Sequence, residues 1–337
     1  MKHLKTLLLA LVLLPAMAFA SGWNDQEYKQ IEQSIQLPQL HKRQFAISSF
    51  GAKQNASAAQ NQKAINRLIS LVSKKGGGKV IVPQGTWKTG AIEMKSHVNL
   101  VLEEGAILQF VFDTNLYPLV RTSWEGIACW NYSPCVYGYK VTDVAITGKG
   151  TIDGGGSNET WWPMNGNPKY GYVDGVTKEC QRLGSRALLL KQAEDGVAFD
   201  ERKFGKGQGL RPQLINFVRS ERILIQDVTL LKSPFWVIHP LLSKNITVDG
   251  VTVWNEGPTA MVATLRLVRT YSSKTVCSIP VTTASPSRAV AIMMVVSGTN
   301  LPATSSSAIA RWRTVMAAWS SEVKSPVVAR MSLLKTA

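Results

Sequence analysis

The chain is poor in cysteine, with only four in 337 residues. This scarcity excludes a small scaffold held together by disulfides. Cys129 and Cys135 are close enough in sequence to pair in an oxidising compartment, and free buried thiols are an equal alternative. None of the cysteine spacings is that of a metal site. We therefore expect neither a bound metal nor another cofactor.

Acidic residues are also scarce, with 22 Asp and Glu against 38 Lys and Arg, a formal net charge of +16. The excess is uneven, because residues 259–337 hold nine Lys or Arg and one acidic residue, Glu322, which makes +8. A basic chain can indicate a nucleic-acid partner. This basic segment lacks the interleaved aromatic residues of single-strand binders, so we expect no nucleic-acid partner.

A hydrophobic run long enough to span a bilayer is missing at the N-terminus. The apolar stretch there runs from Leu7 to Leu14, and a spanning helix needs about 20 residues. Lys2 and Lys5 precede this stretch, and Ala18-Phe19-Ala20 follows it. The order is typical of a secretory signal peptide cut after residue 20. We expect a secreted or periplasmic protein without a membrane span.

The strongest internal pattern is a repeat of 23 residues between positions 215 and 256. Short runs of alternating, mostly β-branched residues predict two strands in each copy. Four apolar positions recur in both copies: Ile223, Ile225, Val228 and Leu230, then Ile246, Val248, Val251 and Val253. Asp227 and Gly250 lie where each copy must turn. A period this short indicates one coil of a stacked solenoid, with a β-sandwich as the alternative.

Weaker copies at 98–108 and 144–152 extend the solenoid upstream. Apolar residues at helical spacing predict an amphipathic helix from Ala58 to Ser73, ended by Gly76-Gly77-Gly78. We interpret this helix as the cap over the open end of the solenoid. The predicted organisation is a signal peptide at 1–20, a lead-in at 21–44, the solenoid at 45–258 with an insertion at 155–210, and an aberrant tail at 259–337.

Several motifs support a family assignment. They include GGGKVIVPQGTWKTGAIEMKSHVNLVLEEGAIL after the helix, then Trp124-Glu125-Gly126, Asn131-Tyr132-Ser133-Pro134, Gly148-Lys149-Gly150-Thr151-Ile152-Asp153-Gly154, Leu210-Arg211-Pro212 and the run Ser233 to Pro240. Together they resemble glycoside hydrolase family 28, the polygalacturonase family. The resemblance implies an all-β, right-handed parallel β-helix that hydrolyses α-1,4-galacturonosidic bonds of pectin with inversion. It also implies a monomer whose partner is a polygalacturonate-type polysaccharide.

Three residues are candidates for binding this polymer: Trp236, His239 and Trp162. Trp161 and Trp162 could stack on sugar rings, and a role as loop anchors is an equal alternative. A non-catalytic, carbohydrate-binding β-helix is therefore the second functional hypothesis. A pectate lyase is a third, but it would need a calcium-binding cluster of carboxylates, and the chain shows none.

The catalytic motifs that the resemblance implies are absent. Glycosidases use paired carboxylates as acid and base, and the family carries them in Asn-x-Asp and Asp-Asp, followed by Gly-His-Gly and Arg-x-Lys. The first motif should follow Asn255-Glu256-Gly257-Pro258, yet residues 259–337 contain no Asp and no His. We predict a β-helix truncated at its C-terminal end, with no catalytic residue and no activity.

A lost nucleotide just after the Pro258 codon would explain this tail. With free third bases, Ala260 to Thr275 can derive from a gene encoding SDGCDPEACKDVLIEN, and Val276 to Pro286 from CVFNTGDDCIA. Arg313 to Val328 can derive from EDGHGGVVIGSEISGG in the same way. All three motifs then appear in the family order, with an aspartate at position 261 and the Asp pair about one coil later. We predict that residues 259–337 are translated out of frame.

Overall fold

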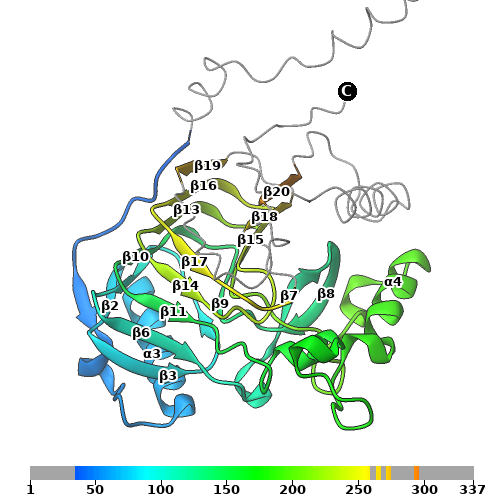
Figure 1. Ribbon diagram of the computed structural model, residues 1–337. Coiled ribbons are helices and arrows are strands. Elements are labelled where there is room, and N and C mark those ends of the chain that lie inside the picture. Colours follow the sequence, from blue (N-terminus) through cyan, green and yellow to red (C-terminus); the bar gives the residue numbers. More distant parts are fainter. Residues whose placement is uncertain (1–34, 259–262, 267–270, 275–291, 296–337) are drawn as a thin grey trace, which may run out of the picture.

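A computed structural model describes residues 35–258 and three short strands beyond them, at 263–266, 271–274 and 292–295 (Figure 1). The predicted signal peptide at 1–20 and most of the predicted tail lie outside the described residues. Within the described part of the chain, no helix has the length and apolar character needed to cross a membrane.

Three parallel sheets run along the axis of the molecule, and each coil of the chain contributes a strand to them (Figure 1). The first sheet has seven strands: β1 (Gln44–Ala46), β2 (Gly78–Val82), β5 (Val98–Leu102), β10 (Thr142–Gly148), β13 (Glu221–Gln226), β16 (Lys244–Asp249) and β19 (Tyr271–Lys274). The second has five: β3 (Gly85–Thr89), β6 (Ala106–Phe110), β11 (Thr151–Asp153), β14 (Thr229–Leu231) and β17 (Thr252–Trp254). This is a parallel β-helix.

The third sheet, called sheet C below, has six strands: β4 (Ile92–Glu93), β9 (Val136–Tyr139), β12 (Ile215–Val218), β15 (Ile238–Leu241), β18 (Ala263–Arg266) and β20 (Ile292–Val295). β7 (Leu119–Trp124) and β8 (Ile127–Tyr132) form an antiparallel hairpin, which is a separate two-stranded sheet. The sheets continue by β18, β19 and β20 past Pro258, where the apolar repeat of the sequence ends. The domain division at residue 258 stays a prediction.

The 23-residue repeat is confirmed by the strand register. Ile223 pairs with Ile246 and Ile225 with Val248 between β13 and β16, and Leu230 pairs with Val253 between β14 and β17. All of these side chains are buried. Because one coil is 23 residues long here, each apolar residue stacks on its equivalent in the next coil.

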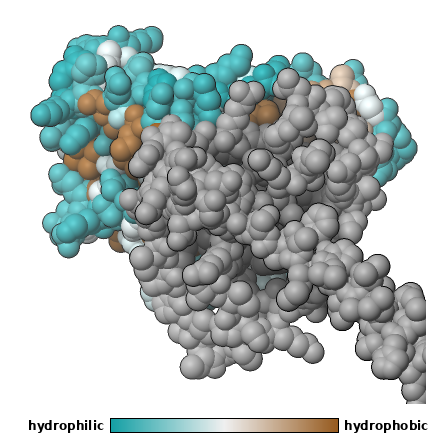
Figure 2. Space-filling model, turned by 90° about the horizontal axis from the view of Figure 1, so that it is seen from above, coloured by the Kyte–Doolittle hydropathy of each residue, from teal (hydrophilic) through white to brown (hydrophobic). Residues whose placement is uncertain are grey.

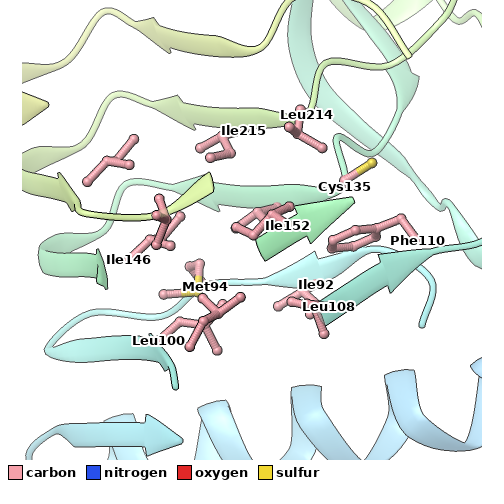
Figure 3. Packing of buried hydrophobic residues seen from close by; sticks show 14 of the residues in the cluster. Ile92, Met94, Leu100, Leu108, Phe110, Cys135, Ile146, Ile152, Leu214 and Ile215 are labelled. Atoms are coloured by element: carbon pink, nitrogen blue, oxygen red, sulfur yellow. The ribbon is translucent and has the colours of Figure 1, made fainter. Parts of the chain in front are cut away.

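The core fills the interior of the coil (Figure 3). Leu100, Leu108, Ile146, Ile152 and Ile215 come from different strands and are all fully buried. Their side chains point toward the axis between the sheets. Neighbouring coils therefore stabilise one another, since each coil buries its apolar side chains only against the coils next to it.

Helix α3 (Ala58–Lys74) closes the N-terminal end, as predicted. Its apolar side, which includes Ile65, Leu68, Ile69 and Val72, is part of the main core. Ser57 and Gln60 form a reciprocal capping box at its start, which satisfies two amide groups that a helix N-terminus leaves without partners. The helix therefore covers the apolar end of the first coil.

Residues 155–210 contribute no strand to the three parallel sheets. They form short helices beside the solenoid: η3 (Trp162–Asn165), η4 (Pro168–Tyr170), η5 (Gln181–Ser185), α4 (Arg186–Glu194) and η6 (Phe199–Glu201). Another short helix, η1 (Ile47–Phe50), follows β1, and η2 (Thr114–Leu116) follows β6. A second hydrophobic cluster, with Trp124, Leu189, Phe204 and Trp236, joins the hairpin and α4 to sheet C.

Viewed from the C-terminal end of the stack, the visible described surface is mostly hydrophilic, and its largest hydrophobic patch lies at the left (Figure 2). The backbone is unusual where four strands of the first sheet begin. His97, Asp143, Arg222 and Asn245 occupy equivalent positions in four coils, and each has a positive φ between 53° and 64°. Non-glycine residues adopt this conformation at a cost of about 1–2 kcal/mol, so the stacked turns must supply compensating contacts.

Candidate functional site

The candidate site lies on the outer face of sheet C. Side chains alternate along β12, so that Ile215 and Phe217 enter the core while Asn216 and Val218 belong to the opposite face. His239 pairs with Asn216 in the register of β15 and therefore shares that outer face. The hairpin covers this face, since Thr122 of β7 contacts Asn216 there.

An aromatic stack occupies the outer face next to the end of β15. The rings of Trp124 and Phe235 are nearly parallel at 5.2 Å between centroids, and those of Phe235 and Trp236 at 4.8 Å. His239 meets Trp236 edge-on at 5.0 Å. Residues from the hairpin and from the segment 233–239 thereby form one aromatic cluster beside the solenoid.

Arg211 lies across this stack. Its guanidinium carbon is 5.0 Å from the centre of the Phe235 ring, a cation–π contact. Nη1 donates hydrogen bonds to Pro234 O at 2.8 Å and to Pro258 O at 3.1 Å. The side chain is fully buried, and burial lowers its pKa to about 9. Arg211 thus connects the aromatic stack to Pro258. The expected catalytic motif should follow this residue in the sequence and is missing there.

A buried polar chain runs beside the stack. The Thr122 hydroxyl donates to Asn216 Oδ1 at 2.9 Å. Asn216 Nδ2 donates to the carbonyl oxygen of His239 and lies 3.2 Å from His239 Nδ1. All three side chains are buried. The imidazole is consequently fixed in orientation by its neighbours.

Trp162 approaches the same region from the insertion and is partly exposed. Its indole N–H donates to Ser233 O at 3.1 Å. The indole also lies against two glycines, because a Cβ on Gly156 or Gly257 would come within 2.4 or 2.5 Å of Trp162 Nε1. The side chain therefore anchors the insertion to the segment that leads to Pro258.

Glu125 is at the tip of the hairpin. Its carboxylate accepts a hydrogen bond from Arg186 Nε of α4 at 2.8 Å. Burial raises the pKa of the Glu125 carboxyl, and the charges of Arg186 and Arg211 oppose this effect. A carboxyl of raised pKa can act as a general acid, but this one is engaged in holding α4 against the hairpin.

The structure brings the rings of Trp236 and His239 into contact. Trp162 lies against the start of the same segment, through its hydrogen bond to Ser233 O. Trp236 and His239 are 1% and 0% exposed, so of the three predicted binding residues only Trp162 presents surface. The roles of all three stay proposals. Trp161, the alternative sugar platform, is a buried core residue. The sequence assigned no role to Arg211, although the quoted Leu210-Arg211-Pro212 motif contained it.

A separate cavity of about 570 Å³ lies between the insertion and residues 112–114. Three carboxylate residues line it, Asp113, Glu159 and Glu179, with Lys178 as the single cation. A polymer of galacturonic acid is anionic and would be repelled there. In the described part of the chain, no cluster of three His, Cys, Asp or Glu residues could hold a metal ion.

Comparison with known proteins places this geometry in context. No family model matches the chain. A Vitis vinifera protein described as a probable polygalacturonase is 31% identical over 202 residues, which are 57% of this chain and 33% of that protein. The chain thus spans about a third of the length of this curated relative.

Two of the similar solved structures are exopolygalacturonases. A hyperthermoactive exopolygalacturonase from Thermotoga maritima is 33% identical with a TM-score of 0.66, over 73% of this chain and 56% of that one. The family 28 exopolygalacturonase of Yersinia enterocolitica, at 20% identity and a TM-score of 0.50, covers 69% of this chain and 42% of its own, and supports the fold alone. These likenesses confirm the resemblance of the chain to the polygalacturonases of glycoside hydrolase family 28 and the right-handed parallel β-helix that it implies.

Proposed function

We propose that the gene encodes a secreted pectinase that hydrolyses α-1,4-galacturonosidic bonds with inversion, and that the chain as printed lacks its catalytic residues. The likeness to the Thermotoga maritima exopolygalacturonase, at 33% identity and a TM-score of 0.66, carries the first half of this proposal. Residues 1–258 carry a formal net charge of +8, from 29 Lys and Arg against 21 Asp and Glu, and this basic balance suits an anionic polymer. Trp162, Trp236 and His239 are proposed to shape the binding groove, with Trp162 at its surface.

The second half rests on the missing carboxylates. Inverting glycosidases need two carboxyl groups roughly 6.5–9.5 Å apart, with room for a water between them. Asp227 and Asp249 are the nearest aspartates before Pro258 in sequence. Asp227 has a φ of 59° and its amide donates to Asp249 O at 3.0 Å. Asp227 follows β13 and Asp249 ends β16, so both lie at the end of strands of the first sheet and not on sheet C.

The decisive experiment compares two forms of the gene. One is expressed as printed, and the other carries a single nucleotide inserted after the Pro258 codon. Release of reducing ends from polygalacturonate is measured for both. We expect activity only from the frame-restored protein. Activity from the printed form would refute the predicted loss of function, and an inactive but folded frame-restored protein would refute the pectinase assignment.

Secretion is proposed from the signal peptide at residues 1–20. It is tested by expressing the full gene in a Gram-negative host and sequencing the N-terminus of the periplasmic product. A mature chain that begins at Ser21 is expected. A product that starts at Met1 in the cytosol would contradict the proposal.

A non-catalytic, carbohydrate-binding β-helix is the second candidate, and the partly exposed Trp162 favours it. The printed chain would then bind polygalacturonate without releasing reducing ends. Trp162→Ala should weaken this binding if the ring stacks on a sugar, because the variant loses the aromatic surface that the sugar covers. Trp162→Phe keeps the ring and removes the bond to Ser233 O, so it separates stacking from anchoring.

A further inference from the structure

The cavity beside the insertion has no role in the proposed hydrolysis. It has a volume of about 570 Å³, and residues from three segments line it, at 112–114, 158–164 and 171–179. Binding sites for small molecules commonly have volumes of about 300–1,000 Å³. None of the described residues that line the cavity belongs to sheet C. The cavity is therefore a second candidate site, separate from the one on the outer face of that sheet.

Phe112 provides an aromatic ring at the cavity. The residue is 40% exposed, although its ring meets that of Trp161 edge-on at 4.8 Å. Because Trp161 is fully buried in the main core, this contact fixes the Phe112 ring in place. Val173 and Val176 are exposed residues of the insertion and line the same cavity. A fixed ring with apolar neighbours offers a surface on which the apolar face of a sugar ring can pack.

Three carboxylates line the cavity, and each is oriented by a hydrogen bond within the protein. The side chain of Asp113 caps η2 by accepting a hydrogen bond from a backbone amide. Glu159 Oε2 accepts from the Ser157 hydroxyl at 2.6 Å, and Glu179 Oε2 accepts from the Tyr132 hydroxyl at 3.2 Å. None of the three carboxylates forms an ion pair with another described residue. Their remaining oxygen atoms can therefore accept hydrogen bonds from a ligand.

The charges around the cavity narrow the class of ligand. A galacturonate carboxylate would be repelled by the three acidic residues. A metal ion has no site here, because in the described part of the chain no three His, Cys, Asp or Glu residues lie close enough to hold one. An organic cation is opposed by Lys178, which lines the same cavity. An uncharged ligand meets none of these obstacles.

The lining contains hydrogen-bond donors as well as acceptors. Lys178 and Asn158 are exposed and line the cavity. An ammonium group only donates, an amide side chain donates and accepts, and a carboxylate only accepts. A hydroxyl group does both, so a ligand with several hydroxyl groups can use every one of these partners. Several hydroxyl groups together with an apolar face are the features of a neutral sugar.

We propose that the cavity between residues 112–114 and the insertion binds a neutral sugar. Phe112 is the surface on which the sugar ring packs, and Asp113, Glu159 and Glu179 accept hydrogen bonds from its hydroxyl groups. The site goes beyond the proposed function, because it needs no catalytic residue and takes an uncharged ligand instead of polygalacturonate. It attaches the protein to a polysaccharide that carries neutral residues.

The first test compares ligands that differ in charge. Saturation-transfer difference NMR of the printed chain is recorded with galactose, glucose, mannose and xylose as neutral sugars. Galacturonate and protonated galactosamine have the ring of galactose and carry a negative and a positive charge. We expect a signal from at least one neutral sugar and weaker signals from both charged sugars. No signal from any neutral sugar, or a preference for galactosamine, would overturn the proposal.

The second test locates the signal. Phe112→Ala should abolish the signal of the neutral sugar, and Phe112→Tyr should keep it because the ring remains. Phe50→Ala is the matched control, since Phe50 is 39% exposed, meets the Phe45 ring edge-on at 6.1 Å and does not line the cavity. Thermal unfolding of each variant shows whether the fold is kept. A signal that survives in folded Phe112→Ala would place the sugar elsewhere and refute the site.

A third measurement tests the carboxylates without touching Phe112. The double variant Glu159→Gln and Glu179→Gln removes two negative charges and keeps an oxygen that accepts at each position. It should retain the signal of the neutral sugar and give a stronger galacturonate signal than the parent, because the repulsion is reduced. An unchanged galacturonate signal would contradict the assigned role of the carboxylates.

The two proposals fail separately. Hydrolysis is measured by reducing ends, whereas this site is measured by the part of the NMR signal that depends on Phe112, since the groove at Trp162 can also take up sugars. A frame-restored protein that cleaves polygalacturonate while the printed chain shows no such signal refutes only the sugar site. A signal that depends on Phe112 in a protein without pectinase activity supports the sugar site and rejects the proposed function.

Discussion

Arg222 and Asp143 form a two-point ion pair between consecutive coils of the solenoid, with N–O distances of 2.7 and 2.8 Å. Asp143 is 4% exposed and also accepts a hydrogen bond from the Gln39 amide at 2.9 Å. His97 of the preceding coil lies 3.5 Å from the same carboxylate. His97, Asp143 and Arg222 thus link three consecutive coils, and each of the three residues has a positive φ.

We predict that Asp143→Asn lowers the free energy of unfolding by about 2 kcal/mol, because hydrogen bonds to charged groups contribute about 1.5–3 kcal/mol. The hydrogen bond from Arg222 lowers the pKa of the Asp143 carboxyl. Its stabilising contribution is therefore present above the unfolded pKa and is lost as the pH falls through the folded value. Urea unfolding at pH 7 and pH 3 measures both effects.

The matched control is Asp200→Asn, which removes an ion pair with Arg121 at 2.9 Å between two exposed side chains. Such pairs contribute about 0–1 kcal/mol. Equal losses for the two variants at pH 7 would contradict a structural role for the buried pair.

The alternation of β13 makes a second prediction. Ile225 is 1% exposed and stacks on Val248, whereas its neighbour Leu224 points to the other face and is partly exposed. Ile225→Ala should cost about 2–5 kcal/mol through lost burial and the cavity left behind. Leu224→Ala should cost less than about 1 kcal/mol. Denaturant titration of both variants checks the difference, and a reversed order would show that the core assignment is wrong.

Two glycines with the same backbone conformation give a third prediction. Gly155 has a φ of 66°, and a Cβ there would lie 2.1 Å from Phe110 O. Gly196 has a φ of 70° with nothing within 4 Å of its Cβ position. Both alanine variants should bear the left-handed penalty of about 1–2 kcal/mol, but Gly155→Ala should lose about 1–3 kcal/mol more from the backbone clash. Tm values of the two variants compared with the parent are the measurement.

The thiols make a fourth prediction. Cys129 and Cys135 are fully buried and form no disulfide, and burial raises the pKa of the Cys129 thiol to about 12. Thiolates, not thiols, react with alkylating agents. In the native protein at pH 8, iodoacetamide should therefore label neither residue, while unfolding in urea should expose both. Mass spectrometry of the peptides detects the labels, and a disulfide between the two would contradict the structure.

The sequence by itself determined the repeat and its consequences. Ile223, Ile225 and Leu230 recur at 23 residues, and the same three residues pair with their equivalents in the next coil. The helix predicted from Ala58 to Ser73 runs from Ala58 to Lys74. These features could be predicted because they depend on local periodicity, and a solenoid is stabilised mainly by contacts between neighbouring coils.

Only the tertiary structure decided what lies on the outer face of sheet C. Trp236 and His239 were predicted to bind the polymer, yet Trp236 is buried in a cluster with the hairpin and the insertion, and His239 is buried against Trp236 and Asn216. Arg211 meets Pro258 across 47 positions, and Trp162 meets Ser233 across 71. No local pattern encodes such contacts, because they depend on how segments far apart in the chain fold back onto the solenoid.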